Sequence, residues 1–285
     1  MSVTSFGNDW QSEDIRRLCA RLDDLGRYAE RGETGVSAYL TPREAKYAAA
    51  YLSARLRAGT ALLWGGYEGA ERVRACILPD YTEGLTSPEG LAADPVASLR
   101  EAGLDDVADT LREAVCAVSV KGSGFRELSH RDYLGSILGL GLERDAIGDI
   151  LVPDTHSAIL LTSARTADFL LTQLEKVATD TVKVAVLPEG TPLAGTRRLQ
   201  TITDTVASER LDCVVAALCN LSREKAQMTV KAGLVELDFE PCEACDTTVE
   251  VPATITVRGY GKFAVRELGG VTRKGRIRLV AGKYV

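Results

Sequence analysis

The chain has 285 residues, of which 45% are hydrophobic and 26% are charged, and its formal net charge is −6. This balance is ordinary for globular domains and excludes wholesale disorder, and the length suits two or three domains. No stretch approaches the roughly 20 apolar residues of a membrane-spanning helix, and the polar, acidic start lacks the pattern of a signal peptide.

Residues 1–93 are expected to form an N-terminal α+β domain. Apolar residues at helical spacing predict a helix over residues 13–31. A second helix begins after Thr41, a good N-cap, because Pro42 suits the first helical position and Glu44 completes a capping box. Residues 61–67 and 72–78 read as two strands around a turn. Residues 79–93 are loop-like and are interpreted as a hinge.

Residues 94–190 show a more specific order of elements. A helix over 96–111 leads into a strand over 114–120, and helices over 129–140 and 163–174 alternate with strands over 149–152, 158–162 and 181–187. Strand–helix–strand–strand–helix–strand is the ferredoxin-like arrangement, which the RRM shares with many unrelated proteins. We therefore expect an RRM-like βαββαβ domain over 94–190, followed by a linker over 191–207 that prolines and glycines interrupt.

Residues 208–285 are expected to form two helices followed by a small sheet, so the whole chain is assigned to the α+β class. Ser222 can cap the second of these helices, which extends to Lys231 and stops at Gly233, a natural left-handed residue. Strands are predicted over 234–239, 254–257, 262–268 and 276–280.

Charge is distributed unevenly along the chain. Residues 258–283 carry eight basic side chains and one acidic side chain, Glu267, so this segment is +7 and the remaining residues carry −13. Such asymmetry is typical of an anion-binding end on an acidic body. Tyr260 and Phe263 could stack on bases, although strand alternation is equally compatible with Phe263 in the core.

Two short helices placed back to back give the strongest indication of function. Arg210 lies near the start of the first helix, and Ser222 and Arg223 lie at the start of the second, where unpaired N–H groups suit phosphate. Any one of these residues is more often a solvated charge, but the whole string at this spacing predicts a phosphate-binding surface. The residues that could bind phosphate there and in the basic C-terminal segment are Arg210, Ser222, Arg223, Lys225, Lys231, Arg258, Lys262, Arg273, Lys274 and Arg276.

Residues 208–257 resemble the alpha-L RNA-binding motif, first described in the small-subunit ribosomal protein "S-four". The resemblance is carried by Arg210-Leu211-Asp212, by Leu221-Ser222-Arg223-Glu224-Lys225 and by Val230-Lys231-Ala232-Gly233. It implies that the basic residues of this string and Ser222 face RNA, and that Asp212 buttresses the helix pair.

A narrower resemblance, to bacterial YlmH-type proteins, covers most of residues 94–285. It is carried by Gly124-Phe125-Arg126-Glu127-Leu128-Ser129-His130-Arg131-Asp132 with Gly148-Asp149-Ile150-Leu151-Val152, and by Arg258-Gly259-Tyr260-Gly261-Lys262-Phe263 with Thr272-Arg273-Lys274-Gly275-Arg276. The resemblance implies a factor that binds rRNA and peptidyl-tRNA on the large ribosomal subunit in ribosome-associated quality control, without covalent chemistry.

Catalytic and metal sites are not expected. Ser129, His130 and Asp132 superficially suggest a triad, but neighbouring residues on a helix point in different directions, and Ser129 is better explained as a helix cap. Cys242 and Cys245 form a C-x-x-C pair without the two further ligands that zinc needs. No phosphate-binding G-x-x-x-x-G-K-[ST] motif is present, so we expect no nucleotide cofactor.

Two alternative functions stay open. One is an RNA-modification-related protein, since the same C-terminal module accompanies pseudouridine synthases and methyltransferases, whose catalytic motifs the first 190 residues lack. The other is a cell-division-associated scaffold, in which the acidic N-terminal part contacts a protein partner. Seven cysteines at irregular spacings indicate reduced thiols and therefore a cytoplasmic protein. We also expect a monomer that does not contact membranes.

Overall fold

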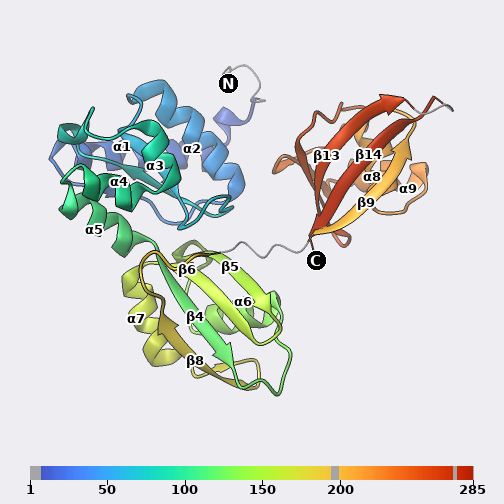
Figure 1. Ribbon diagram of the computed structural model, residues 1–285. Coiled ribbons are helices and arrows are strands. Elements are labelled where there is room, and N and C mark those ends of the chain that lie inside the picture. Colours follow the sequence, from blue (N-terminus) through green and yellow to red (C-terminus); the bar gives the residue numbers. More distant parts are fainter. Residues whose placement is uncertain (1–7, 194–198, 272–274, 285) are drawn as a thin grey trace. The chain divides into compact units, whose positions relative to one another are not determined.

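The computed structural model describes residues 8–193, 199–271 and 275–284, and the chain divides into two units, residues 1–196 and 197–285. Both units combine helices with antiparallel sheets, which confirms the α+β class (Figure 1). Within the described ranges, no helix combines the length and the apolar character needed to cross a membrane.

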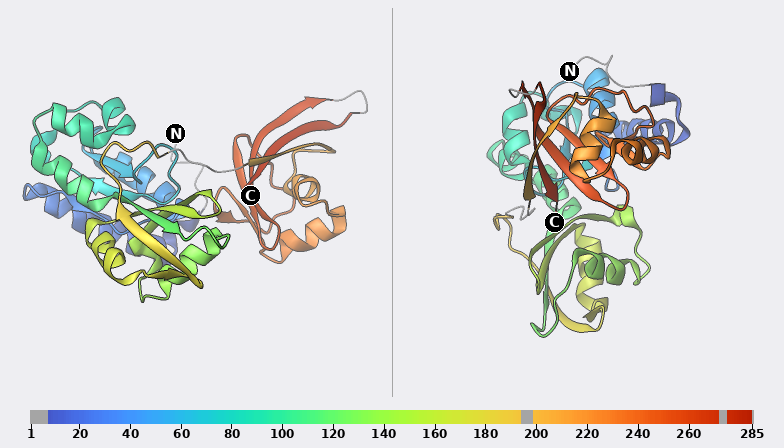
Figure 2. Two further views of the ribbon diagram at one scale, coloured as in Figure 1. Left: turned by 60° about the horizontal axis from the view of Figure 1, so that its bottom comes forward. Right: turned by 90° about the vertical axis from the view of Figure 1, so that its right-hand side faces the viewer.

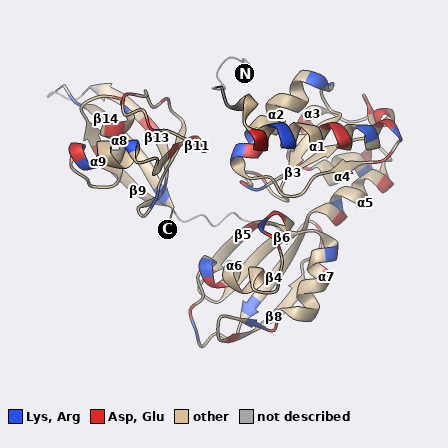
Figure 3. Ribbon diagram, turned by 180° about the vertical axis from the view of Figure 1, so that it is seen from behind, with Lys and Arg blue, Asp and Glu red and all other residues tan. Residues whose placement is uncertain are grey.

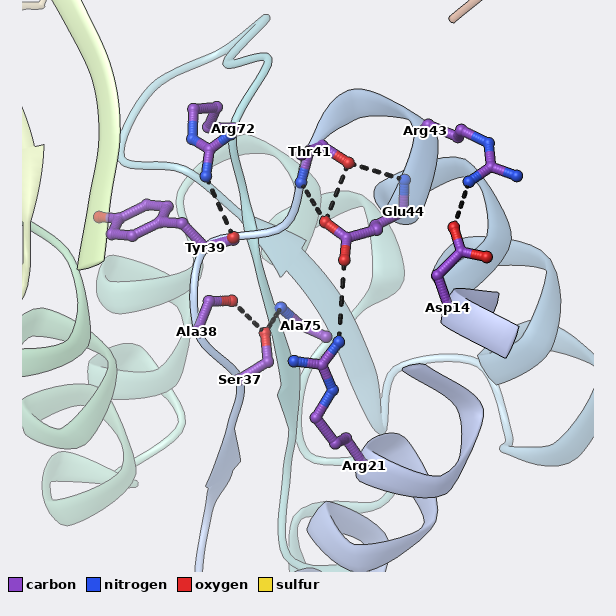
Figure 4. A network of polar contacts seen from close by, with 10 residues as sticks. All are labelled: Asp14, Arg21, Ser37, Ala38, Tyr39, Thr41, Arg43, Glu44, Arg72 and Ala75. Carbon is purple, nitrogen blue, oxygen red and sulfur yellow. Dashed lines mark hydrogen bonds and ion pairs between the residues drawn. The ribbon is translucent and has the colours of Figure 1, made fainter. Parts of the chain in front are cut away.

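The first half of unit 1 packs helices against a small sheet. η2 (Asn8–Gln11), α1 (Glu13–Glu30) and α2 (Pro42–Arg55) accompany three strands in the order β1 (Gly35–Val36), β3 (Arg74–Ile77), β2 (Ala61–Trp64). The predicted capping box is confirmed, because the Thr41 N–H donates to Glu44 Oε2 (2.8 Å) and the Glu44 N–H donates to Thr41 Oγ1 (3.2 Å). Arg21 Nη2 of α1 lies 3.7 Å from Glu44 Oε1, the second oxygen of the same carboxylate (Figure 4). The capping residue Glu44 therefore also joins α2 to α1.

The predicted hinge and the helix after it differ from expectation. Residues 79–93 contain η3 (Asp80–Thr82) and α3 (Pro88–Ala93), which Ser87 caps by accepting from the Gly90 N–H. The helix expected over 96–111 is two helices, α4 (Pro95–Glu101) and α5 (Asp105–Ala114), because Gly103 adopts a φ of +74° that ends the first. Buried Tyr39 packs with Leu151 and Leu161, so residues 1–93 and 94–190 share a core cluster within unit 1.

The second half of unit 1 is a five-stranded sheet with two helices on one face. Its elements are β4 (Cys116–Gly122), α6 (His130–Leu138), η4 (Arg144–Ala146), β5 (Ile147–Asp154), β6 (Ser157–Thr162), α7 (Ala164–Gln173), β7 (Lys176–Val177) and β8 (Asp180–Val186). The strand order β5-β6-β4-β8-β7 contains the order of the split βαβ arrangement. Tyr133 of α6 and Leu170 of α7 pack against Val118 and Val120 of β4, so both helices cover the same face.

Unit 2 is a six-stranded antiparallel sheet that two helices cover on one face (Figure 2). Its elements are β9 (Leu199–Val206), α8 (Leu211–Leu218), α9 (Arg223–Lys231), β10 (Val235–Leu237), β11 (Glu240–Pro241), β12 (Ala253–Val257), β13 (Gly261–Val271) and β14 (Ile277–Tyr284). The order is β11-β10-β12-β13-β14-β9. Val214 of α8 and Val230 of α9 belong to the same buried cluster as Ile255 and Phe263 of the sheet.

Two sequence predictions about unit 2 are corrected. The expected linker 191–207 contains β9, whose residues pair with β14 from Leu199–Tyr284 to Val206–Ile277. Its partner lies more than 70 residues later in the chain, so no local pattern marks the strand. The strand expected over 234–239 ends at Leu237, because Asp238 and Phe239 adopt φ values of +49° and +69° and turn the chain into β11.

Candidate nucleic-acid interface

The Asp212 side chain of α8 connects the two helices of unit 2, α8 and α9. This side chain is fully buried, and it accepts hydrogen bonds from Arg210 Nε to Oδ1 (3.1 Å) and from Gln227 Nε2 to Oδ2 (2.8 Å). Arg223 Nε lies 3.6 Å from the same Oδ2. We call Asp212, Arg210, Arg223 and Gln227 the Asp212 cluster. It joins the residue before α8 to two positions on α9, so Asp212 buttresses the helix pair.

The charge of Asp212 is stabilised although the group is buried. Burial alone raises the pKa of a carboxyl group, but the hydrogen bonds from Arg210, Gln227 and Cys213 and the charge of Arg210 together outweigh it and hold the pKa of Asp212 at about 2. The two guanidinium groups remain partly exposed, with 39% of the Arg210 side chain and 58% of the Arg223 side chain accessible. The carboxylate is therefore hidden, whereas two oriented cations face solvent.

The remaining predicted residues of α9 lie at its two ends. Ser222 Oγ accepts from the Lys225 N–H at 3.3 Å, so the predicted cap is confirmed. Lys225 is exposed in the first turn beside Arg223, and the acidic Glu224 is exposed in the same turn. Lys231 is exposed in the last turn, before Gly233 with its φ of +66°. The fold thus brings Arg210 and Arg223 together at Asp212, places Lys225 in the same first turn of α9 and leaves Lys231 at the opposite end of the helix.

The basic C-terminal segment is spread along the sheet. Arg258 is exposed in the turn before β13, where its N–H donates to the Leu234 carbonyl, and Arg276 precedes β14. β13 has 11 residues, so its two ends lie roughly 30 Å apart. The Lys262 ammonium lies over the ring of Phe239 (4.8 Å), and Arg276 Nε donates to Thr205 Oγ1 (2.8 Å). Arg273 and Lys274 lie outside the described residues.

Aromatic residues of this segment differ in exposure. Phe263 is 1% exposed and belongs to the core, whereas Tyr260 is 40% exposed and stays available for contact.

The Ser129 hydroxyl donates to Asp132 Oδ2 at 2.6 Å. Ser129 and Asp132 form a capping box, in which Asp132 accepts from the Ser129 N–H (2.8 Å), so the predicted cap is confirmed. Burial lowers the pKa of His130, and the nearby Arg144 lowers it further.

The two cysteines of the C-x-x-C pair form hydrogen bonds with different residues. Cys245 Sγ donates to the Gln227 carbonyl (3.7 Å), and Cys242 Sγ lies 3.4 Å from Thr247 Oγ1. Among the residues that the structure describes, no group of three or more His, Cys, Asp or Glu side chains could hold a metal ion.

Comparison with known proteins identifies relatives of the chain. A curated Bacillus subtilis (strain 168) protein named "Ribosome-associated protein quality control protein P2" is 33% identical over 218 residues, which are 75% of this chain and 74% of that protein. Residues 115–189 match the family model described as "Putative RNA-binding domain in YlmH". The chain belongs to the YlmH family.

A solved structure of the family was also found. "Cell division protein ylmH from Streptococcus pneumoniae" is 17% identical, with a TM-score of 0.44 over 62% of this chain and 93% of that chain.

The domain matched to the YlmH model lies in unit 1, where sequence reasoning placed no RNA-contacting residue. Figure 3 shows basic residues on this part of the chain as well as on unit 2. Lys121 on β4 and Lys183 on β8 are exposed register partners, and Phe125 is 98% exposed in the loop after β4. The signal available in the sequence was an aromatic residue between Gly124 and Arg126 in a mostly polar loop.

Proposed function

We propose that this protein binds rRNA and peptidyl-tRNA on the large ribosomal subunit during quality control of stalled nascent chains. It acts in the cytoplasm as a monomer and holds RNA in place without covalent chemistry. Two comparisons support the proposal: the Bacillus subtilis relative is named for ribosome-associated quality control, and the YlmH model matched to residues 115–189 is described as RNA-binding.

The Asp212 cluster is the observation that carries the proposal. Guanidinium groups bind phosphate through paired N–H donors, and binding is tighter when the side chain is already oriented. The buried Asp212 carboxylate orients Arg210 and Arg223 from one side and leaves their outer faces accessible. Lys225 adds a third cation at the start of α9, where free backbone N–H groups also favour phosphate.

Co-sedimentation with purified large subunits tests the proposal. The variant Arg223→Gln/Lys225→Gln removes two exposed cations, so we expect binding to weaken roughly tenfold or more and the salt dependence to lose a slope of about 2. Subunits that carry peptidyl-tRNA should bind wild-type protein more tightly than empty subunits.

The matched control is Arg16→Gln/Arg31→Gln, which removes the same charge from exposed positions of unit 1. Equal co-sedimentation of both double variants, with unchanged salt dependence, would contradict the RNA-facing assignment. Equal binding to loaded and empty subunits would contradict a contact with peptidyl-tRNA.

A further inference from the structure

Phe125 is an unusually exposed aromatic residue. It is 98% exposed, whereas the next most exposed large apolar side chains that the structure describes, Met228, Tyr81 and Leu85, are 58%, 55% and 54% exposed. Phe125 lies in the segment between β4 and α6, which begins at the tip of the β4 arrow in Figure 1. An apolar ring that lies almost wholly in water gains most from a partner that covers it.

The loop that carries Phe125 is anchored on both sides. On the N-terminal side, the Ser123 N–H donates to Asp180 Oδ2 at 2.9 Å. On the C-terminal side, Arg126 Nη1 donates to Thr179 Oγ1 (2.6 Å), and the Leu128 N–H donates to the Thr155 carbonyl (2.7 Å). The ring therefore projects from a braced loop, so little conformational entropy is lost when it binds.

Basic residues accompany the ring. Lys121 and Lys183 lie directly opposite each other on neighbouring strands, and both project from the sheet face opposite α6 and α7, because Val120 and Val182 point toward the helices. Like charges in directly opposed positions destabilise a sheet, and a polyanion relieves that repulsion. Lys121 and Phe125 are four residues apart, so their Cα atoms lie within about 14 Å of each other.

Acidic residues around the loop are mostly engaged in structure. Asp180 accepts from Ser123, and Asp154 accepts from the His156 N–H (2.8 Å) and from Ser157 Oγ (2.7 Å). Asp132 is held in the capping box of α6, and Glu127 is the exposed acidic side chain of the loop itself. Asp180 lies on the helix-covered face of the sheet with Val182, so the opposite face presents Lys121 and Lys183 near the loop that carries Phe125.

We propose that Phe125 stacks on an unpaired base of a single-stranded RNA segment whose phosphates bind Lys121 and Lys183. An aromatic platform beside a basic groove is the arrangement that binds single-stranded nucleic acid, and every base can use the same platform. The proposal rests on the RNA-binding function proposed above and assigns residues 121–183 their own RNA site, separate from the Asp212 cluster.

Fluorescence anisotropy with a labelled single-stranded ten-nucleotide RNA tests the proposal in the full chain. Phe125→Ala should weaken binding about 5- to 150-fold, whereas Phe125→Trp should retain it. The tryptophan of the Phe125→Trp variant should also be quenched by the RNA, beyond any change in the wild-type signal. Lys121→Gln/Lys183→Gln should reduce the salt slope by about 1.4. Tyr81→Ala is the matched control, because it removes another exposed aromatic ring of unit 1.

The outcomes separate this site from the general function. If wild-type protein binds the RNA and Phe125→Ala binds it equally well, the stacking site is refuted while RNA binding stands. If Phe125→Ala loses co-sedimentation with large subunits but keeps the ten-nucleotide RNA, Phe125 contacts a ribosomal protein and the proposal is wrong. If wild-type protein binds neither the RNA nor the subunits, the proposed function itself fails.

Discussion

Replacing Asp212 by asparagine removes a buried charge that joins α8 to α9. The carboxylate accepts hydrogen bonds from Arg210 and Gln227 and forms an ion pair with Arg223. In asparagine, an NH2 group replaces one of the two carboxylate oxygens, so its N–H donors would face N–H donors of these neighbours. A carboxyl group with a pKa of about 2 in the folded state and about 3.9 in the unfolded state contributes roughly 2–3 kcal/mol at neutral pH. We therefore expect Asp212→Asn to lower the free energy of unfolding of unit 2 by about 2–4 kcal/mol.

The effect should depend on pH with a defined sign. Because folding lowers the pKa of Asp212, the stabilisation is fully present above the unfolded-state pKa and is lost as the pH falls from about 4 toward about 2. The difference between wild type and Asp212→Asn should accordingly be largest at neutral pH and should shrink across this window.

Urea unfolding of the full chain can separate the two units. Both tryptophans, Trp10 and Trp64, lie in unit 1, so tryptophan fluorescence reports on that unit, whereas far-ultraviolet circular dichroism reports on both. Asp212→Asn should shift a component of the dichroism transition and leave the fluorescence transition unchanged. Glu250→Gln, at an exposed position of unit 2, is the control. An unchanged dichroism transition, or an equal loss at pH 7 and pH 2.5, would refute the reasoning.

Three further substitutions test individual contacts. Ser222→Ala removes the cap of α9 and should cost unit 2 about 1 kcal/mol by dichroism; no loss would mean that the cap is dispensable. Tyr133→Phe should leave the stability of unit 1 unchanged or raise it by up to about 1 kcal/mol, because within the described ranges the buried Tyr133 hydroxyl has no hydrogen-bond partner. A clear loss of stability would mean that the hydroxyl does have a partner. Asp149→Asn should cost unit 1 about 1–3 kcal/mol in the fluorescence transition, since Asp149 accepts from the Tyr67 hydroxyl (2.6 Å) and from the Glu71 N–H (2.8 Å); an unchanged midpoint would contradict this.

Local signals in the sequence were reliable where the structure depends on neighbouring residues. Thr41, Ser129 and Ser222 cap helices as predicted, because a cap and the N–H groups it accepts from lie within three residues of each other. Gly103 was missed as a helix end, since an amphipathic pattern can continue through a short break. β9 was missed because its partner strand, β14, is far away in the sequence, and a threonine-rich segment becomes a strand only when that partner is present.

In the predicted interface, too, some features follow from the sequence and others depend on the tertiary structure. The sequence alone determined the α+β class, the two helices that begin near Arg210 and Ser222, and the concentration of positive charge toward the C-terminal end. Only the tertiary structure decided that Asp212 is buried between Arg210, Arg223 and Gln227, that Arg258 and Arg276 lie at opposite ends of β13, and that Phe125 is held out in solvent. The physical reason is that composition and spacing fix charge and local geometry, whereas burial, orientation and exposure depend on which distant strands and helices pack together.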